Sequence, residues 1–283
     1  MEEKVVIGVD IGGSTTKICG FSTGAKELIA PIFIKASDQT ASIYGALGKF
    51  CSDNAISLDQ VEKIYMTGVG STFINKPLYG IPTRRVAEFN SIGLGGIYLS
   101  GLPRAIVVSM GTGTAIVKAE GDECEHLGGT GVGGGTLTGL SKRLLGMEEY
   151  DHIIELAASG NLSNVDLWVE DIMSGDRGGL PAHMTASNFG RVSDVTSRAD
   201  LALGIINMVF ETAGMMGVFA SKKYGIKDIV VTGILTTIPQ SRPLLNELGR
   251  LQGMNFIIPD MSQFGTVIGS ALHYYKTGYR ERL

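Results

Sequence analysis

Two stretches of this chain share one design: an apolar strand, a turn rich in glycine and threonine, and a second strand. The first runs Val5-Val6-Ile7-Gly8-Val9-Asp10-Ile11-Gly12-Gly13-Ser14-Thr15-Thr16-Lys17-Ile18, and the second covers residues 105–118 with the turn Gly111-Thr112-Gly113-Thr114. Each stretch predicts a β-hairpin. Because the design occurs twice, the sequence indicates two similar lobes, each built around one hairpin. Two unrelated Gly/Thr turns are the simpler alternative.

The first turn has the composition of a phosphate-binding site. Its glycines let backbone N–H groups approach phosphate oxygens, the hydroxyls of Ser14 and Thr15 add donors, and Lys17 supplies a positive charge. Asp10, at the end of the strand, is placed to hold Mg²⁺ directly or through water. These residues predict a site for the γ-phosphate of a nucleotide. A hairpin tip with a solvated aspartate is the alternative interpretation.

Composition favours small-molecule chemistry. The chain has 283 residues, is 44% hydrophobic and carries a net charge of -4, without the basic patch that nucleic acids or anionic membranes require. Its three cysteines are widely spaced and odd in number, which argues against a disulfide framework or a Cys-x-x-Cys metal site. The acidic start, followed at once by a strand, is not typical of a signal peptide, so we expect a cytoplasmic protein.

The order of the other elements predicts an α/β fold with a mixed sheet. Pro31 interrupts a third strand over 28–35 and places it near an edge. A helix over 42–51, a strand from 61 ending in a glycine turn, and a glycine-studded helix over 91–99 follow. The apolar stretch 201–220 is long enough to cross a membrane, but its central Asn207 and Glu211 favour a buried helix. The remaining predicted elements are strands over 228–233 and 256–258 and a helix over 266–275.

Further candidate site residues lie outside the first hairpin. Glu88, near a predicted helix start, is a candidate general base, or simply a first-turn acid favoured by the helix dipole. Facing hairpins would clamp a triphosphate from both sides, with Thr112 and Thr114 as donors.

The glycine run 128–135 contains a literal Gly-x-Gly-x-x-Gly, but no buried strand precedes it, so we expect a turn that opens a phosphate-binding helix at 136–145. Tyr150 can cover a purine or be an ordinary surface tyrosine, and Gly233 ends a strand where adenine can rest.

The histidines and the tryptophan predict no site of their own. His152 and His183 lack metal-ligand spacing and are read as structural or solvated, and His273 is read as a packing residue in the last helix. Trp168 lies between Leu167 and Val169 and is read as core.

The glycine-rich motifs of this chain resemble those of a known superfamily. The first hairpin, the turn Gly111-Thr-Gly-Thr and the later Val231-Thr-Gly233 resemble the two phosphate motifs and the adenosine motif of the actin-like ATPase superfamily. Within it, the chain resembles type II pantothenate kinases through four segments: Ala87-Glu-Phe-Asn90, the run Leu127-Gly-Gly-Thr-Gly-Val-Gly-Gly-Gly135, Thr185-Ala-Ser-Asn-Phe-Gly190 and Phe264-Gly-Thr-Val-Ile-Gly269.

The resemblance implies a fold of two ribonuclease-H-like lobes with mixed five-stranded sheets flanked by helices. The N-terminal lobe would be 1–92, completed by the C-terminal helix 266–283, and the second lobe 93–265, with a hinge near 90–100. It also implies ATP with Mg²⁺, a homodimer joined through long helices, a possible coenzyme A or acyl-coenzyme A feedback ligand, and phosphorylation of the primary hydroxyl of pantothenate as the first step of coenzyme A biosynthesis.

The resemblance assigns roles by position. Glu88 becomes the base that takes the hydroxyl proton. Metal and phosphate are assigned to Asp10, Gly12, Gly13, Ser14, Thr15 and Lys17. The nucleotide is assigned to Thr112, Gly113, Gly134, Gly135, Thr136, Leu137, Thr138, Tyr150 and Gly233. Two positions depart from the family: His126 replaces an arginine that contacts pantothenate, and Asn90 replaces an acid. Histidine has no bidentate fork and is shorter than arginine, so both departures affect the acceptor side.

The sequence leaves three alternative functions open. The chain can be a kinase of this fold for another hydroxylated small molecule, or a weakly catalytic regulatory protein that binds a nucleotide or coenzyme A. It can also be an ATP-driven reductive activator with an iron–sulfur cluster bridging a dimer, although that class needs closely placed cysteines.

Overall fold

The computed structural model describes residues 3–12, 15–35, 38–175 and 177–276. The chain divides into two compact units. One comprises Met1–Val107, Val117–His126 and Pro259–Leu283, and the other comprises Val108–Ile116 and Leu127–Ile258. The predicted lobe boundary between residues 92 and 93 stays a prediction.

The first five-stranded sheet has the strand order β3-β2-β1-β4-β5. Its strands are β1 (Val5–Ile11), β2 (Thr15–Ser22), β3 (Leu28–Lys35), β4 (Val61–Thr67) and β5 (Thr83–Arg85). The β1–β2 and β2–β3 pairs are antiparallel, whereas β1–β4 and β4–β5 are parallel. The sheet is therefore mixed, as predicted. The predicted hairpin is confirmed, and the strand with Pro31 lies at the edge.

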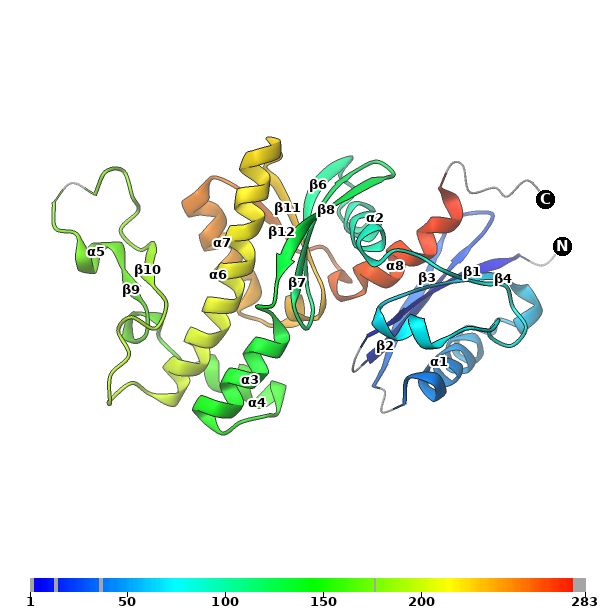
Figure 1. The fold of residues 1–283 in the computed structure, drawn as a ribbon, viewed down its shortest axis with the longest axis horizontal. Coiled ribbons are helices and arrows are strands. Elements are labelled where there is room, and N and C mark those ends of the chain that lie inside the picture. Colours follow the sequence, from blue (N-terminus) through cyan, green and yellow to red (C-terminus); the bar gives the residue numbers. More distant parts are fainter. Residues whose placement is uncertain (1–2, 13–14, 36–37, 176, 277–283) are drawn as a thin grey trace. The chain divides into compact units, whose positions relative to one another are not determined.

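Strand β1 separates two hydrophobic clusters because successive side chains point to opposite faces of a sheet. Val5, Ile7, Val9 and Ile11 join the cluster that contains α1 (Gln39–Asp53), whereas Val6 joins the cluster around α8 (Gly265–Leu272). Figure 1 shows α1 beside this sheet. Gly8 lies against α8, and an added Cβ there would stand 2.5 Å from the Val267 carbonyl oxygen.

Helix α2 (Glu88–Ser100) packs backbone against backbone on α8. A Cβ at Gly95 would lie 1.8 Å from the Gly265 carbonyl oxygen, and one at Gly269 would lie 1.8 Å from the Ser91 carbonyl oxygen. The glycines that make this helix look irregular in the sequence therefore permit a very close helix pair. This packing fixes the N-terminus of α2, where Glu88 lies.

The second five-stranded sheet repeats the strand arrangement of the first, with the order β12-β11-β6-β7-β8. Its strands are β6 (Arg104–Met110), β7 (Thr114–Glu120), β8 (Glu123–Thr130), β11 (Asp228–Thr232) and β12 (Asn255–Ile257). Matching β1, β2, β3, β4 and β5 to β6, β7, β8, β11 and β12 reproduces the order, so the predicted duplication is real. The glycine run differs from the prediction: its first part, up to Thr130, belongs to the largely exposed edge strand β8.

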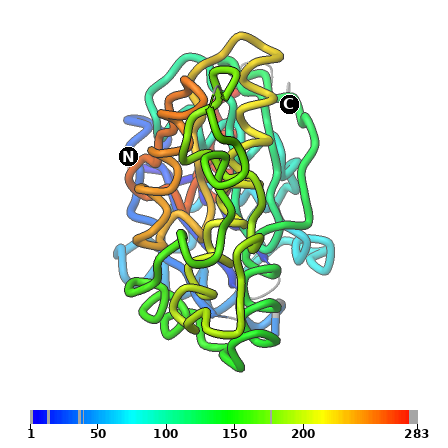
Figure 2. Tube along the Cα trace, turned by 90° about the vertical axis from the view of Figure 1, so that its left-hand side faces the viewer, coloured from blue at the N-terminus to red at the C-terminus, as the bar shows by residue number. Residues whose placement is uncertain are grey.

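The second unit contains the remaining helices and a small separate sheet. They are α3 (Gly134–Leu145), α4 (Tyr150–Ala157), α5 (Val169–Ile172), α6 (Arg198–Tyr224) and α7 (Ser241–Gln252), and β9 (Leu167–Trp168) paired with β10 (Thr185–Ser187). Figures 1 and 2 show the segment that precedes α6, with β9, α5 and β10, lying beside that helix. Trp168 is half-buried in β9, so its prediction as a core residue is wrong.

Helix α6 is the predicted apolar stretch. Among the described residues it is the one helix long and apolar enough to cross a membrane by length and composition, and 61% of its apolar window is buried inside the protein. Asn207 and Phe210 are among its buried residues. The predicted buried helix is therefore confirmed as a packed element of the second unit. The six described 3-10 helices are η1 (Leu58–Gln60), η2 (Val69–Phe73), η3 (Leu162–Asn164), η4 (Ile234–Thr237), η5 (Ser262–Phe264) and η6 (His273–Tyr275).

Candidate nucleotide and acceptor site

Asp10 and Lys17 face each other across the first hairpin. They are paired in the β1–β2 register, and the Lys17 Nζ lies 3.7 Å from the Asp10 Oδ2. Both side chains are largely buried, at 13% exposure for Asp10 and 15% for Lys17. Burial raises the pKa of Asp10 above its usual range, and the charge of Lys17 opposes this rise. A carboxylate and an ammonium thus share a poorly solvated position at the end of β1.

The turn that joins β1 to β2 is closed by the Gly12 N–H, which donates to the Thr15 carbonyl oxygen at 2.9 Å. Thr15 opens β2 and is half-buried. The predicted phosphate donors Gly13 and Ser14 lie outside the described residues.

Gly68 lies against Asp10, and sequence reasoning did not select it as a candidate site residue. It follows β4 with a φ of 83°, in the left-handed region that favours glycine. An added Cβ would lie 2.7 Å from the Asp10 Oδ1 and 2.5 Å from the Ile11 carbonyl oxygen. Gly68 therefore leaves the room that the Asp10 carboxylate occupies. The signal was present in the sequence, because Thr67-Gly68 repeats the Thr232-Gly233 of the predicted adenosine motif.

Glu88 is the first residue of α2, as predicted. Its pKa is raised, first by loss of solvent and then by the negative charge of Asp10, while Lys17 lowers it. The helix N-terminus provides a partial positive charge that favours the carboxylate. The first unit thus brings Asp10, Lys17 and Glu88 into one electrostatically coupled group, with two carboxylates and one cation.

His126 lies flat against Phe89, the residue after Glu88. The two ring centroids are 3.5 Å apart and the planes differ by 5°. Both side chains remain exposed, so the stacked pair is an exposed aromatic surface. Phe89 directly follows Glu88 in the sequence, which places this surface at the start of α2. Asn90 lines a polar hollow of about 360 Å³ with Lys118, Cys124 and acidic residues of β7 and β8. His126 and Asn90 are the two departures from the family pattern. His126 is the one that stacks on Phe89, directly after the candidate base Glu88.

The second hairpin turn is built against the start of α3. The N–H groups of Gly134 and Gly135 donate to the carbonyl oxygens of Gly111 and Thr112, at 2.8 Å and 2.9 Å. A Cβ at Gly133 would lie 2.7 Å from the Thr112 carbonyl oxygen. Gly134 and Gly135 therefore brace the turn with their own amides. Thr112 is exposed at its tip.

Gly233 joins this turn from β11. It has a φ of 96°, and an added Cβ would lie 2.4 Å from the Met110 carbonyl oxygen. This arrangement repeats that of Gly68 against Ile11 in the first unit. The second unit therefore gathers Thr112, Gly113, Gly134, Gly135 and Gly233 around one turn.

The remaining residues predicted to bind the nucleotide have different surroundings in the structure. Leu137 is 0% exposed and packs in the core, so only its backbone is available to a ligand. The hydroxyls of Thr136 and Thr138 donate to the carbonyl oxygens of Gly131 and Gly134. The hydroxyl of Tyr150 is buried without a hydrogen-bond partner in the structure, and burial raises its pKa. A ligand atom near Tyr150 would satisfy that hydroxyl.

The described residues fit a magnesium ion that takes one carboxylate from the protein and its remaining ligands from water and phosphate oxygens. Among the described residues, no group of three or more His, Cys, Asp or Glu side chains forms a metal site. Mg²⁺ is commonly bound by one or two carboxylates together with water and phosphate oxygens. Asp10, with its largely buried carboxylate at the end of β1, provides that kind of donor.

The predicted packing role of His273 is confirmed. Its ring is 4% exposed, stacks on Tyr65 with the centroids 6.4 Å apart, and lies 3.5 Å from the Ser91 hydroxyl. Burial, with the charges of Lys276 and Arg84, lowers the pKa of His273 to about 4. The other two histidines are exposed, and His183 approaches Glu170 at 3.2 Å.

The sequence comparison decides the family. The Fumble family matches residues 102–243. The chain belongs to the Fumble family. Similar curated proteins are the type II pantothenate kinases of Bacillus cereus, 27% identical over 95% of this chain and 98% of that protein, and of Oceanobacillus iheyensis, 28% identical over 84% and 86%. This member of the Fumble family is accordingly a kinase.

Solved structures support the actin-like ATPase fold. Component A of (R)-2-hydroxyglutaryl-CoA dehydratase from Acidaminococcus fermentans superposes with a TM-score of 0.70 at 17% identity, over 95% of this chain and 97% of that chain. The activator of 2-hydroxyisocaproyl-CoA dehydratase from Clostridium difficile, with bound ADPNP, gives 0.68 at 14% identity, over 95% and 93%. A ROK family glucokinase from Streptomyces griseus, in complex with glucose and AMPPNP, gives 0.59 at 13% identity, over 94% and 98%.

Proposed function

We propose that this chain transfers the γ-phosphoryl group of ATP to the primary hydroxyl of pantothenate. The observation that carries the proposal is the coupled group of Asp10, Lys17 and Glu88 in a chain whose relatives are named type II pantothenate kinases. It joins a cation and a metal-binding carboxylate to a second carboxylate that can accept a proton. Two fold neighbours carry the ATP analogues ADPNP and AMPPNP, which supports ATP as the donor.

Phosphoryl transfer depends mainly on positioning and on neutralising charge. In the proposal, Lys17 and the hydroxyl of Thr15 bind phosphate oxygens at the turn that the Gly12 N–H closes, and Asp10 holds Mg²⁺. The ion, when bound, neutralises charge on the phosphate oxygens. Because the pKa of Asp10 is already raised by burial, an added cation would stabilise its ionised form.

Glu88 is the proposed general base. It accepts the proton of the acceptor hydroxyl as the oxygen attacks the γ-phosphorus. A base is more effective when its pKa lies closer to the working pH, and the pKa of Glu88 is raised. The proton therefore moves to a carboxylate that loss of solvent and Asp10 have already made more basic.

On the nucleotide side, the proposal uses the turn that gathers Thr112, Gly113 and Gly233. Thr112 is exposed and can donate to phosphate oxygens. Gly134 and Gly135 hold that turn in place, and the surface over Gly233 accommodates the adenosine. The unpartnered Tyr150 hydroxyl and the α3 residues Thr136 to Thr138 complete the proposed nucleotide site.

The acceptor side differs from the expected pattern through His126. Stacking on Phe89 fixes the plane of its imidazole. In the proposal, a ring N–H of His126 donates to the carboxylate end of pantothenate, in place of an arginine. A single donor gives less binding than a bidentate guanidinium. We therefore expect a higher KM for pantothenate than an arginine in this position would give.

A kinase for another hydroxylated small molecule is the second candidate function, because His126 and Asn90 alter the acceptor side. The dehydratase component A and the dehydratase activator have a more similar fold than the glucokinase, with TM-scores of 0.70 and 0.68 against 0.59, but likeness at 14–17% identity concerns the fold alone. A reductive activator of the kind left open by the sequence would need an iron–sulfur cluster. An iron–sulfur cluster needs thiolate ligands. Cys19 and Cys51 are buried in the clusters on opposite faces of the first sheet, so they do not form a pair of thiols that could bind a cluster shared with a second protomer; Cys124 packs against the cluster of Cys19.

The test is an acceptor panel with MgATP, in which ADP release and the mass of the phosphorylated product are measured together. Phosphopantothenate is the expected product, and His126→Arg is expected to lower the KM for pantothenate. Phosphorylation of a different acceptor would transfer the assignment to the second candidate function. ADP release without any phosphorylated acceptor would contradict both.

Three further parts of the proposal extend beyond the reaction. The protein acts as a homodimer joined through its long helices, coenzyme A or an acyl derivative binds as a feedback ligand, and the location is cytoplasmic. Sedimentation, and inhibition by added coenzyme A, test the first two directly.

A further inference from the structure

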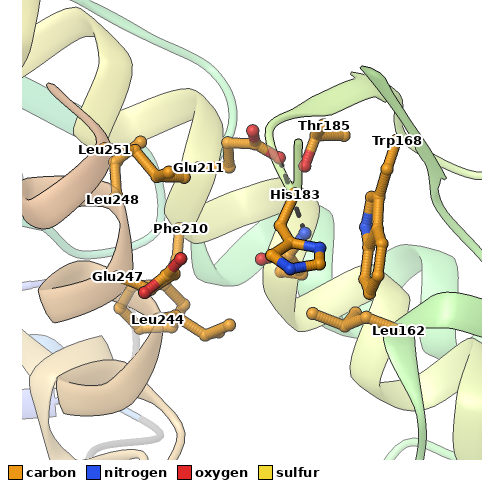
Figure 3. Close-up of a pocket in the computed structure, with 11 residues that line it drawn as sticks. Leu162, Trp168, His183, Thr185, Phe210, Glu211, Leu244, Glu247, Leu248 and Leu251 are labelled. Atoms are coloured by element: carbon orange, nitrogen blue, oxygen red, sulfur yellow. Dashed lines mark hydrogen bonds between the residues drawn. The ribbon is translucent and has the colours of Figure 1, made fainter. Parts of the chain in front are cut away.

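The second unit contains a cavity of about 260 Å³ that none of the predicted site residues lines. It lies between α6, α7 and the segment that carries β9 and β10. Figure 3 shows the side chains around it. They are Leu162, Trp168, His183, Thr185, Asn207, Phe210, Glu211, Leu244, Glu247, Leu248 and Leu251.

Most of the wall is apolar. Four leucines and Phe210 contribute hydrocarbon, and Phe210 itself is fully buried. Opposite them stands Trp168, whose ring meets His183 edge to face at 5.2 Å and 77°. In Figure 3 the Trp168 ring stands across the cavity from Phe210 and Leu244. An alkyl chain fits such walls, and a tryptophan face also attracts a cation.

Glu211 is the distinctive polar residue of the cavity. Its Oε2 accepts hydrogen bonds from the side-chain amides of Asn188 and Asn207, at 2.9 Å and 3.5 Å. Thr185 also donates to it. Each of these donors is neutral. The other carboxylate on the wall, Glu247, is held by Arg250, whose Nε lies 2.9 Å from its Oε2.

A second carboxylate lies behind Glu211. Asp166 is 0% exposed and accepts from the Phe189 N–H at 2.9 Å and the Asn207 amide at 2.8 Å. Asn207 therefore bridges the buried Asp166 and the half-buried Glu211. Burial raises the pKa of both Asp166 and Glu211, because loss of solvent disfavours their ionised forms. A cation in the cavity would oppose that effect.

The Thr185-Ala-Ser-Asn-Phe-Gly190 segment builds this arrangement. Asn188 binds Glu211, and Phe189 takes a φ of 60°, which directs its N–H to Asp166. Gly190 packs closely, since an added Cβ would lie 2.9 Å from the Leu167 Cβ. This segment therefore holds Trp168 and Thr185 next to α6 and shapes the cavity.

We propose that this cavity binds a small primary alkylammonium, with its alkyl chain against the leucines and its ammonium between Glu211 and the face of Trp168. The cavity offers one carboxylate whose printed hydrogen-bond donors are all neutral, one tryptophan ring and a largely apolar wall, whereas its second carboxylate, Glu247, is paired with Arg250. A cation with a short alkyl chain satisfies all three. An alkanoate would meet the Glu211 carboxylate with a like charge, and a neutral alcohol would gain only the apolar contacts.

The fluorescence of Trp168 provides the test, because it is the one tryptophan of the chain. The full-length protein without ATP is titrated at neutral pH with hexylammonium, 1-hexanol and hexanoate. A saturable change is expected with hexylammonium at about tenfold lower concentration than with hexanol. Hexanoate is expected to bind more weakly than hexanol.

Three variants make the result specific. Glu211→Gln keeps hydrogen-bonding atoms, and it is expected to weaken hexylammonium binding about tenfold while hexanol binding stays within about twofold. Glu247→Gln, the matched control on the same wall, is expected to change hexylammonium binding by no more than about twofold. Leu251→Phe narrows the cavity and is expected to weaken binding of both ligands. Equal binding of hexanoate and hexylammonium, unchanged hexylammonium binding in Glu211→Gln, or no saturable change would overturn the proposal.

Discussion

The imidazole of His126 lies parallel to the ring of Phe89, with 3.5 Å between the centroids. Phe89 directly follows the proposed base, so this stack connects β8 to the start of α2. Without the stack, the exposed His126 would be free to adopt other rotamers. The contact is thus a means of presenting one ring nitrogen in a fixed direction.

Phe89→Leu is expected to raise the KM for the acceptor and to leave kcat within about twofold. An aromatic pair contributes about 0.5–1.5 kcal/mol, which corresponds to roughly a 2- to 10-fold loss in kcat/KM. Steady-state kinetics with varied acceptor measure the change. Phe33→Leu, on an exposed edge-strand residue, is the matched control. A fall in kcat with an unchanged KM would show that Phe89 does not act through acceptor binding.

Gly68→Ala is expected to reduce both stability and activity. The backbone of Gly68, with φ 83° and ψ 162°, lies in a region almost restricted to glycine, which costs about 1–3 kcal/mol for alanine, and the new Cβ would press on the Asp10 carboxylate. Urea unfolding and kcat measure the two effects. Gly101→Ala is the matched control, because Gly101 has a φ of 69° and no atom within 4 Å of an added Cβ. Equal effects of the two substitutions on kcat would remove Gly68 from the site.

The pH profile of kcat/KM is expected to rise on its acidic limb through a pKa above 4.5. Glu88 must be ionised to accept a proton, and its pKa is raised from that ordinary value by loss of solvent and by Asp10. Activity therefore falls as the pH drops through the raised pKa. Rates measured between about pH 3.5 and pH 8 locate the inflection. An acidic limb that lies below pH 4.5 would mean that another group is the base.

His273 is expected to make the protein less stable in acid. Its pKa is about 4 in the folded state, against 6.5 for an unperturbed histidine, so the unfolded chain binds the additional proton between these values. Stability is then complete above pH 6.5 and falls as the pH drops towards 4, by about 3 kcal/mol for a shift of this size. Urea unfolding at pH 7 and pH 4.5 measures the loss. His273→Gln is expected to reduce the pH dependence, and an equal dependence in the variant would contradict this account.

The structural features that the sequence predicted depend on the pattern of neighbouring residues. Alternating apolar residues indicated the β1–β2 hairpin, Pro31 indicated an edge strand, and Glu88 was expected at a helix start. These features depend on residues close together in the chain, where periodicity and turn chemistry are informative.

The features that were missed depend on contacts between distant residues. Gly68 meets Asp10 only because β4 pairs with β1, and His126 meets Phe89 only in the folded protein. The glycines of β8 looked like a loop because an exposed edge strand lacks an apolar face. Trp168 was assigned to the core from its apolar neighbours, whereas its own ring lines a cavity.

A single-turnover experiment with MgATP and pantothenate, with phosphopantothenate detected by mass, tests the central claim most directly. The wild-type protein is expected to form product, and Glu88→Gln is expected to bind ATP normally while the rate falls by about 10²–10⁴-fold, as for loss of a general base. Equal product formation by wild type and Glu88→Gln, or no phosphopantothenate from a wild-type protein that binds ATP, would contradict the account.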